Sequence, residues 1–324
     1  MPATNVCVHN NSHNKGDIPP LTRVLSHNLK IMNAKAFILL CYLTIVSIAE
    51  LVLTYDSVSL GLSIYVILML VLVGYSSLHT MYRDKLKNGV WEKHLLFSRI
   101  LKPSPDGKKI NLFIKELDET KTSENNFIGV LKCLTLAPLI RIMSVSMPLS
   151  SLEQVNWYLL INLPLFAVVF LLLRSQSQSW RDLGFTAGRL PIQLLVALAG
   201  FFLGMIDYSL LQPSPLIVTL SPENFIAPAL ILLVFTGFSE ELIFRGIIQR
   251  NTDGIIGGYK SLIFTSLLFA AMHIGWNSLP DLCFVFFVGL FYGFIYQKTK
   301  TLSGITLSHG ITNITMFLLL PFIA

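Results

Sequence analysis

Two adjacent glutamates and an arginine lie inside an otherwise apolar stretch, at Glu240, Glu241 and Arg245. An ionised group at membrane depth costs roughly 2.5–3.5 kcal/mol on insertion scales, so such groups generally face a protein interior and have a function there. On a helix, Glu241 and Arg245 are four residues apart and share a face, which lets them form an ion pair. Glu240 points about 100° away from Glu241 and is left free to accept a proton.

Polar residues of a complementary kind follow on the next two apolar segments. His273 comes four residues after Phe269, so the aromatic ring can pack beside the imidazole, and Asn313 comes four residues after His309. A carboxylate base, a histidine that orients or shares a proton, and neutral donors for an oxyanion are the groups that split an amide with water. We therefore take Glu240, His273, His309 and Asn313 as the candidate catalytic residues.

The elements that must position these residues are long apolar runs. The 324-residue chain is 53% hydrophobic and only 13% charged, against about 25% charged residues in soluble domains. Runs of about 20 apolar residues indicate membrane-spanning helices, because a helix satisfies its own backbone in lipid. The sequence predicts an all-α, polytopic membrane helix bundle of about nine transmembrane helices. The expected spans are 36–55, 60–82, 127–149, 157–173, 191–212, 225–248, 261–276, 282–297 and 303–323.

Lysine and arginine alternate between the connections and predict an orientation. The connections without either residue are 56–59, 150–156, 213–224 and 277–281, and the tail and the other connections are basic. By the positive-inside rule the basic connections face the cytoplasm. We expect a cytoplasmic amino terminus, an outward carboxyl terminus, and a site reached from the cytoplasmic half of the membrane.

The predicted spans divide the chain into five parts. They are a polar cytoplasmic tail at 1–35, an amino-terminal transmembrane hairpin at 36–82, a cytoplasmic loop at 83–126, scaffold transmembrane helices at 127–224 and a catalytic core at 225–324.

Two ionisable residues of the scaffold helices stand out as well. Arg141 is deep in its span and needs a partner, so it is either a clasp between helices or a contact for a substrate carboxylate or phosphate. Asp207, near the outer end of its span, is expected to face solvent or to cap a helix.

The polar residues of the last third form three motifs on consecutive segments. Glu-Glu-x-x-x-Arg at 240–245, Phe-x-x-x-His at 269–273 and His-x-x-x-Asn at 309–313 occur in that order. They resemble the motifs of the CPBP family, also called the CAAX protease and bacteriocin-processing family or Abi family. This family includes the Rce1-type CAAX prenyl endopeptidases. The resemblance covers roughly residues 225–320.

The resemblance implies a role for each motif residue. Glu240 and His273 would activate the water, and His309 and Asn313 would form the oxyanion site. The residues that would support the site are Glu241, Arg245 and Phe269. The resemblance also implies an integral protein of a bacterial or archaeal cytoplasmic membrane.

A metal-dependent mechanism stays open at this point. The His-Glu-x-x-His pattern of zinc proteases is absent. Glu240, His273 and His309 are nevertheless the right residue types for a zinc site with three protein ligands and an open position. One histidine per helix, with Asn313 able to serve the oxyanion, favours a site without a cofactor.

The leading prediction is an intramembrane endopeptidase acting on a membrane-associated peptide or protein, with the lipid bilayer as its other partner. A prenylated tail or a leader peptide would be the substrate. Alternatives are an inactive scaffold that binds membrane peptides, a bacteriocin self-immunity protein, a haem protein with axial His273 and His309, and a proton-coupled transporter. The paired carboxylates argue against haem, and the absence of a repeat of broken helices argues against transport.

Charge and cysteine usage exclude further classes. The net charge of +6 is accounted for by the basic connections, so we expect no nucleic-acid partner. The four cysteines are scattered without a Cys-x-x-Cys spacing, which indicates neither a disulfide framework nor a structural zinc site.

Overall fold

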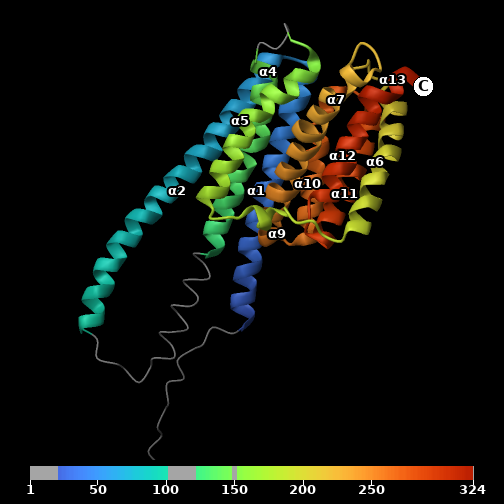
Figure 1. The fold of residues 1–324 in the computed structure, drawn as a ribbon. Coiled ribbons are helices and arrows are strands. Elements are labelled where there is room, and N and C mark those ends of the chain that lie inside the picture. The colour runs from blue at the N-terminus through green and yellow to red at the C-terminus, as the bar shows by residue number, and fades with distance from the viewer. Residues whose placement is uncertain (1–20, 101–121, 148–151, 324) are drawn as a thin grey trace, which may run out of the picture.

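The computed structural model describes residues 21–100, 122–147 and 152–323, with the backbone alone at 21–32 and 84–100. All regular structure in these ranges is helical, in agreement with the predicted polytopic bundle (Figure 1). The longer helices are α1 (Leu21–Tyr55), α2 (Val58–Ile100), α4 (Leu136–Ser146), α5 (Gln154–Ser175), α6 (Leu190–Leu211), α7 (Pro222–Ile231), α10 (Gly258–Ala271), α11 (Leu279–Thr299) and α12 (Ser303–Ile314). Shorter elements are η1 (Trp180–Leu183), α8 (Ser239–Glu241), α9 (Arg250–Ile256), η4 (Ile274–Trp276) and α13 (Leu320–Ile323).

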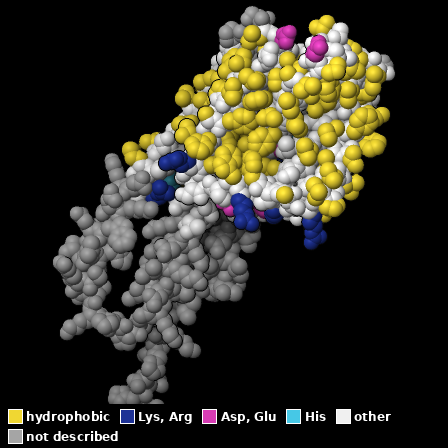
Figure 2. Space-filling view, viewed as in Figure 1, with side chains coloured by type: hydrophobic (Ala, Val, Ile, Leu, Met, Phe, Trp, Pro, Cys, Tyr) yellow, Lys and Arg dark blue, Asp and Glu magenta, His cyan; other side chains and the backbone are white. Residues whose placement is uncertain are grey.

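Eight helical segments of the described ranges are long and apolar enough to cross a membrane. They are Asn33–Tyr55, Val58–Arg83, Thr122–Ser146, Gln154–Ser175, Leu190–Leu211, Pro222–Ile256, Leu279–Thr299 and Ser303–Ile323. Each of the eight corresponds to one of the nine predicted spans. Hydrophobic side chains cover the sides of the bundle, as expected for a surface in contact with lipid (Figure 2).

The predicted span at 261–276 differs from the others. Its helix, α10, has 14 residues, which is about 21 Å at 1.5 Å per residue and short of a bilayer core of about 30 Å. It packs against α1 and α11, and most of its side chains are buried, including Phe264, Leu268 and Phe269. A helix enclosed by other helices need not match the thickness of the lipid. The backbone then turns at His273 into η4.

Two predicted boundaries also shift. α1 begins at Leu21, so the second half of the predicted tail at 1–35 is helical, and α2 continues to Ile100 into the predicted loop at 83–126. The other parts of these two predictions, at 1–20 and 101–121, lie outside the described residues.

The connections gather at two ends of the bundle (Figure 1). The start of α7, the start of α11 and α13 lie at one end, and α9 lies at the other. Arg181, Arg250 and Lys300 line one polar pocket at the α9 end, and Lys and Arg side chains collect toward this end in Figure 2. We call it the basic end; it is the end that the sequence analysis expects in the cytoplasm.

Candidate active site

The helix with the two glutamates changes its winding on both sides of them. In the run Pro222–Ile256, the π-helical stretches η2 (Leu232–Phe238) and η3 (Leu242–Gln249) flank the three residues of α8. A third π-helical stretch, η5 (Thr315–Leu319), follows α12 shortly after Asn313. π-Helical turns within α-helices are frequent at functional sites.

Glu241 and Arg245 form the predicted ion pair, and it is fully buried. Arg245 Nη1 donates to Glu241 Oε1 at 2.9 Å, and the two residues are 1% and 0% exposed. Arg245 Nη2 donates to the Gly289 carbonyl at 3.4 Å, and the guanidinium lies 4.4 Å from the centre of the Phe269 ring. The pair therefore ties η3 to α10 and α11 and does not face the cavity described below.

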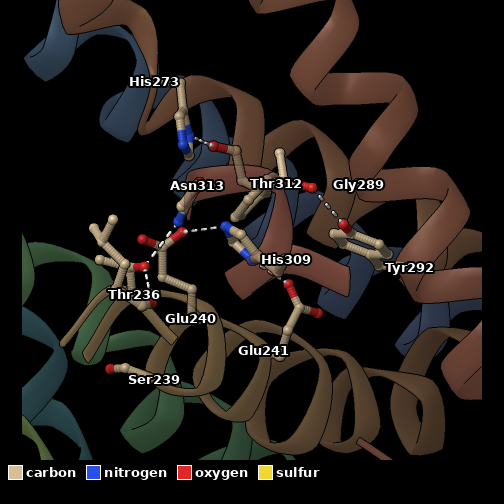
Figure 3. A network of polar contacts seen from close by, with 12 residues as sticks. Thr236, Ser239, Glu240, Glu241, His273, Gly289, Tyr292, His309, Thr312 and Asn313 are labelled. Carbon is tan, nitrogen blue, oxygen red and sulfur yellow. Dashed lines mark hydrogen bonds and ion pairs between the residues drawn. The ribbon is translucent and has the colours of Figure 1, made fainter. Parts of the chain in front are cut away.

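His309 lies between the two glutamates (Figure 3). Its Nδ1 is 2.8 Å from Glu241 Oε1, and its Nε2 is 3.9 Å from Glu240 Oε2. The ring stacks on Tyr292 with centroids 5.8 Å apart and is nearly buried. Glu240 differs from its neighbour because 30% of its side chain is exposed. Glu241 therefore fixes the imidazole, whereas Glu240 presents its carboxylate to open space.

His273 is fixed at the end of α10 by backbone and ring contacts. Its Nδ1 is 2.8 Å from the Phe269 carbonyl oxygen. A carbonyl only accepts, so Nδ1 carries the proton and Nε2 of the neutral ring remains an acceptor. The Phe269 ring packs beside the imidazole, as the four-residue spacing predicted, at 4.7 Å between centroids.

Asn313 is held by a threonine that the sequence analysis did not single out. Asn313 Nδ2 donates to Thr236 Oγ1 at 2.7 Å, and the Thr236 hydroxyl donates in turn to the Leu232 carbonyl. The helices approach closely here because Gly237 has no side chain; a Cβ there would lie 2.7 Å from the Gly310 nitrogen. An amide nitrogen carries two protons, so one N–H of Asn313 remains for another acceptor.

A cavity of about 130 Å³ brings all four candidate catalytic residues together. Its wall includes Glu240, His273, His309 and Asn313. Further lining residues are Tyr158, Asp207, Trp276, Asp281, Phe284, Val285, Val288, Tyr292, Met316 and Phe317. Three segments that are far apart in the chain thus converge on one site.

The expectation for Asp207 is wrong. Its side chain is half-buried and lines the cavity, and its Oδ1 is shielded from solvent. α6 packs closely against α12, and the face of α6 that carries Asp207 is turned toward the interior of the bundle.

Glu240, His273 and His309, the residues left open as possible zinc ligands, do not form a set of ligands as they are placed. Within the ranges that the structure describes, no three His, Cys, Asp or Glu side chains lie close enough together to hold a metal ion. This placement does not fit a three-ligand zinc site.

A second buried ion pair lies behind His273. Arg141 Nε is 2.6 Å from Glu50 Oε1, and Arg141 Nη2 donates to the Met272 carbonyl at 2.6 Å. The Tyr65 hydroxyl also donates to Glu50 Oε1 at 2.6 Å. Of the two interpretations of Arg141, the structure supports the clasp between helices. The clasp holds the carbonyl of the residue directly before His273, which the sequence analysis missed.

Fold and cavity together define the class of protein: an integral membrane helix bundle that encloses a site of carboxylates and histidines. Residues 222–315 match the sequence model of a family described as type II CAAX prenyl endopeptidase Rce1-like. The match covers less than half of the chain and confirms the predicted resemblance over these residues. A search of curated proteins and a search of solved structures found no match. α1 to α6, with Glu50, Arg141 and Asp207, lie outside the matched range.

Proposed function

We propose that the protein is an intramembrane endopeptidase that hydrolyses a peptide bond of a membrane-associated peptide, such as a prenylated tail or a leader peptide. The observation that carries this proposal is the unequal placement of the two glutamates. Glu241 is buried between Arg245 and His309, whereas Glu240 lines the cavity with a partly exposed carboxylate. Such a cavity offers one free base beside a fixed histidine.

The reaction begins with a water molecule held between Glu240 and His273. His273 Nε2 accepts a hydrogen bond from the water, and Glu240 takes its proton as the oxygen attacks the peptide carbonyl carbon. The carbonyl π electrons move to oxygen and form a tetrahedral oxyanion. When the C–N bond breaks, the proton on Glu240 passes to the departing amine, which leaves a carboxylic acid and an amine as products.

The oxyanion needs donors that are fixed before the substrate arrives. Asn313 has one N–H that Thr236 does not use. His309 donates to Glu241 through Nδ1, so its Nε2, which faces the cavity beside Glu240, donates only from the imidazolium form, with a proton on both nitrogens; two neighbouring glutamates favour that form. Donors held in place in this way typically contribute about 2.7–4 kcal/mol each to the stability of the transition state. We assign Asn313 and His309 to this role.

The chemistry proposed here has no step through a metal ion. Among the described residues, the side chains that could bind zinc do not lie close enough together to hold a metal ion. We expect the purified protein to keep its full rate of cleavage after exhaustive chelation. Loss of activity that returns with zinc alone would contradict the metal-free mechanism.

The sequence predicts that the site is reached from the cytoplasmic half of the membrane, and we revise this route of access. The lining residues Trp276 and Asp281 belong to η4 and the first turn of α11, at the end of the bundle opposite the basic end. With the basic end in the cytoplasm, the cavity extends toward the outer half of the membrane. We propose that the substrate enters from that side. In cells that carry Cys283→Ser, the further variant Trp276→Cys should react with an impermeant maleimide added outside; no reaction with it would contradict entry from that side.

The test of the function is cleavage by the full-length protein in lipid vesicles. Membrane peptides from cells carrying the wild type should include products that cells carrying Glu240→Gln lack, and the purified wild type should generate the same products. Glu223→Gln is the matched control, because Glu223 is exposed on α7 of the same helical run. A Glu240→Gln variant that retains the biological effect and the products would show a non-catalytic peptide-binding scaffold instead.

A further inference from the structure

A second pair of carboxylates faces the same cavity at some distance from Glu240. Asp207 on α6 and Asp281 on α11 both line the cavity, and their carboxyl groups are near enough to interact electrostatically. Asp281 is 1% exposed. Among the described residues, neither of its carboxyl oxygens has a hydrogen-bond partner, and neither has Asp207 Oδ1.

A buried carboxylate without partners is costly. An unpaired polar group in an apolar setting costs several kcal/mol, and native proteins leave few such groups. One proton shared by Asp207 and Asp281 relieves their mutual repulsion but leaves one negative charge on the pair. This charge still lacks a cation.

The rest of the cavity supplies no permanent cation. Three carboxylates line it, those of Glu240, Asp207 and Asp281, and no lysine or arginine is among its lining residues. His273 is near enough to act on Asp281 electrostatically, but the proposed mechanism uses its neutral ring. The two arginines buried nearest to the site are already used, Arg245 by Glu241 and Arg141 by Glu50. The cavity is therefore complementary to a positive group and would repel a carboxylate placed at the aspartates.

The distance between this pair and the reacting groups follows from α11. Asp281, Val285, Val288 and Tyr292 all line the cavity, and their spacing of four, three and four residues places them on one face of the helix. Asp281 is eleven residues before Tyr292, whose ring stacks on His309, which corresponds to about 16 Å along the helix. An extended peptide covers that distance with about five residues. Valine side chains line the wall between them.

The geometry points to a second subsite in which Asp207 and Asp281 bind a cationic group of the peptide substrate, at most about five residues from the bond that is cut. The group is a Lys or Arg side chain or a terminal ammonium, and the residues between it and the bond are apolar. The inference rests on the proposed peptidase function, because it describes how that substrate is recognised.

The experiment measures binding and cleavage separately, with the full-length protein in vesicles. Binding is measured on the Glu240→Gln variant with fluorescent apolar peptides of one length that carry Lys, Gln or Glu at successive positions, each with a free or an acetylated amino terminus. We expect the best Lys peptide to bind at least tenfold more tightly than its Gln counterpart, and the Glu peptide to bind most weakly. If acetylation removes the preference, the bound cation is the terminal ammonium; if not, it is the side chain.

Asp281→Asn and Asp207→Asn, each introduced into the Glu240→Gln background, should reduce the Lys-over-Gln ratio toward one. Glu223→Gln in the same background should leave the ratio unchanged. Because asparagine keeps the shape of aspartate, thermal unfolding of each variant checks that the fold is retained. Equal binding of Lys and Gln peptides, or a preference that survives both substitutions, would overturn the subsite. The cleavage assay, on a chain with Glu240 intact, tests the peptidase function separately from the subsite. If no cleavage is found but the Lys preference remains, the peptidase function alone is refuted.

Discussion

Two Arg–Glu ion pairs are buried in the described part of the bundle, and each lies behind one of the site's histidines. The Glu241–Arg245 pair is formed within one helical run by residues four positions apart, and Glu241 contacts His309 directly. The Glu50–Arg141 pair joins α1 to α4 across 91 positions and reaches His273 only through the Met272 carbonyl. The first pair is almost completely buried, whereas 18% of the Arg141 side chain is exposed.

The different origins of the two ion pairs show that the candidate active site extends beyond the part of the chain that matches the family. His309 is fixed from within residues 222–315, whereas His273 is fixed both by Phe269 within that range and, through the Met272 carbonyl, by Arg141 outside it. The carbonyls at the end of α10 lack partners within their own helix, and a cation is favourable there. Arg141 meets this need, and Glu50 and Tyr65 in turn hold Arg141.

The largest effect on stability is expected at the Glu241–Arg245 pair, whose members lie four positions apart. Arg245→Leu leaves Glu241 buried without its cation and should lower the free energy of unfolding by about 3–5 kcal/mol. Equilibrium unfolding in a bilayer-like detergent measures this change. Arg250→Leu, on the same helical run but only partly buried, is the matched control. A loss no greater than that of the control would contradict the structural role of the pair.

Disruption of the Glu50–Arg141 pair should have a smaller effect on stability and a distinct effect on catalysis. Arg141→Leu leaves Glu50 with its hydrogen bond from Tyr65, so we expect a loss of about 2–3 kcal/mol. Displacement of His273 should lower kcat roughly 10- to 100-fold, with little change in KM.

A double-mutant cycle sharpens this second prediction. Glu50→Gln combined with Arg141→Leu should cost about 1–3 kcal/mol less than the sum of the two single variants, because the residues are in contact. Strict additivity would show that the two side chains do not act as a pair.

The contrast between the pairs also explains what could be predicted from the sequence. The Glu241–Arg245 pair and the packing of Phe269 on His273 follow from a four-residue spacing on one helix, and both are present. The partner of Arg141 did not follow, because spacing does not indicate which of several helices lie side by side. Opposite charges buried in separate spans were the only signal for Glu50.

The winding of the helices is a second feature that spacing does not reveal. The expectation of regular helices gave the right face for Glu240, but it contained no sign of η2, η3 or η5 around the site. The role of Asp207 was missed for a related reason. An acidic residue near the end of a span resembles a solvent-facing group until the cavity beside it is known.

The smallest effect is expected at the outermost member of the long-range network. Tyr65→Phe removes one hydrogen bond to Glu50 and should lower the free energy of unfolding by about 1–2 kcal/mol, with a decrease in kcat smaller than that of Arg141→Leu. The same unfolding and cleavage assays measure both. If Tyr65→Phe reduced kcat more than Arg141→Leu, the proposed path from Glu50 to His273 would be wrong.

The central claim is that the adjacent glutamates have different roles, Glu240 as the base and Glu241 as the support of Arg245 and His309. The most direct measurement compares Glu240→Gln with Glu241→Gln in one vesicle assay that records both cleavage and unfolding. We predict that Glu240→Gln lowers kcat by roughly 10²- to 10⁴-fold with little change in unfolding, whereas Glu241→Gln weakens the fold itself. Cleavage by Glu240→Gln at the wild-type rate would contradict the account.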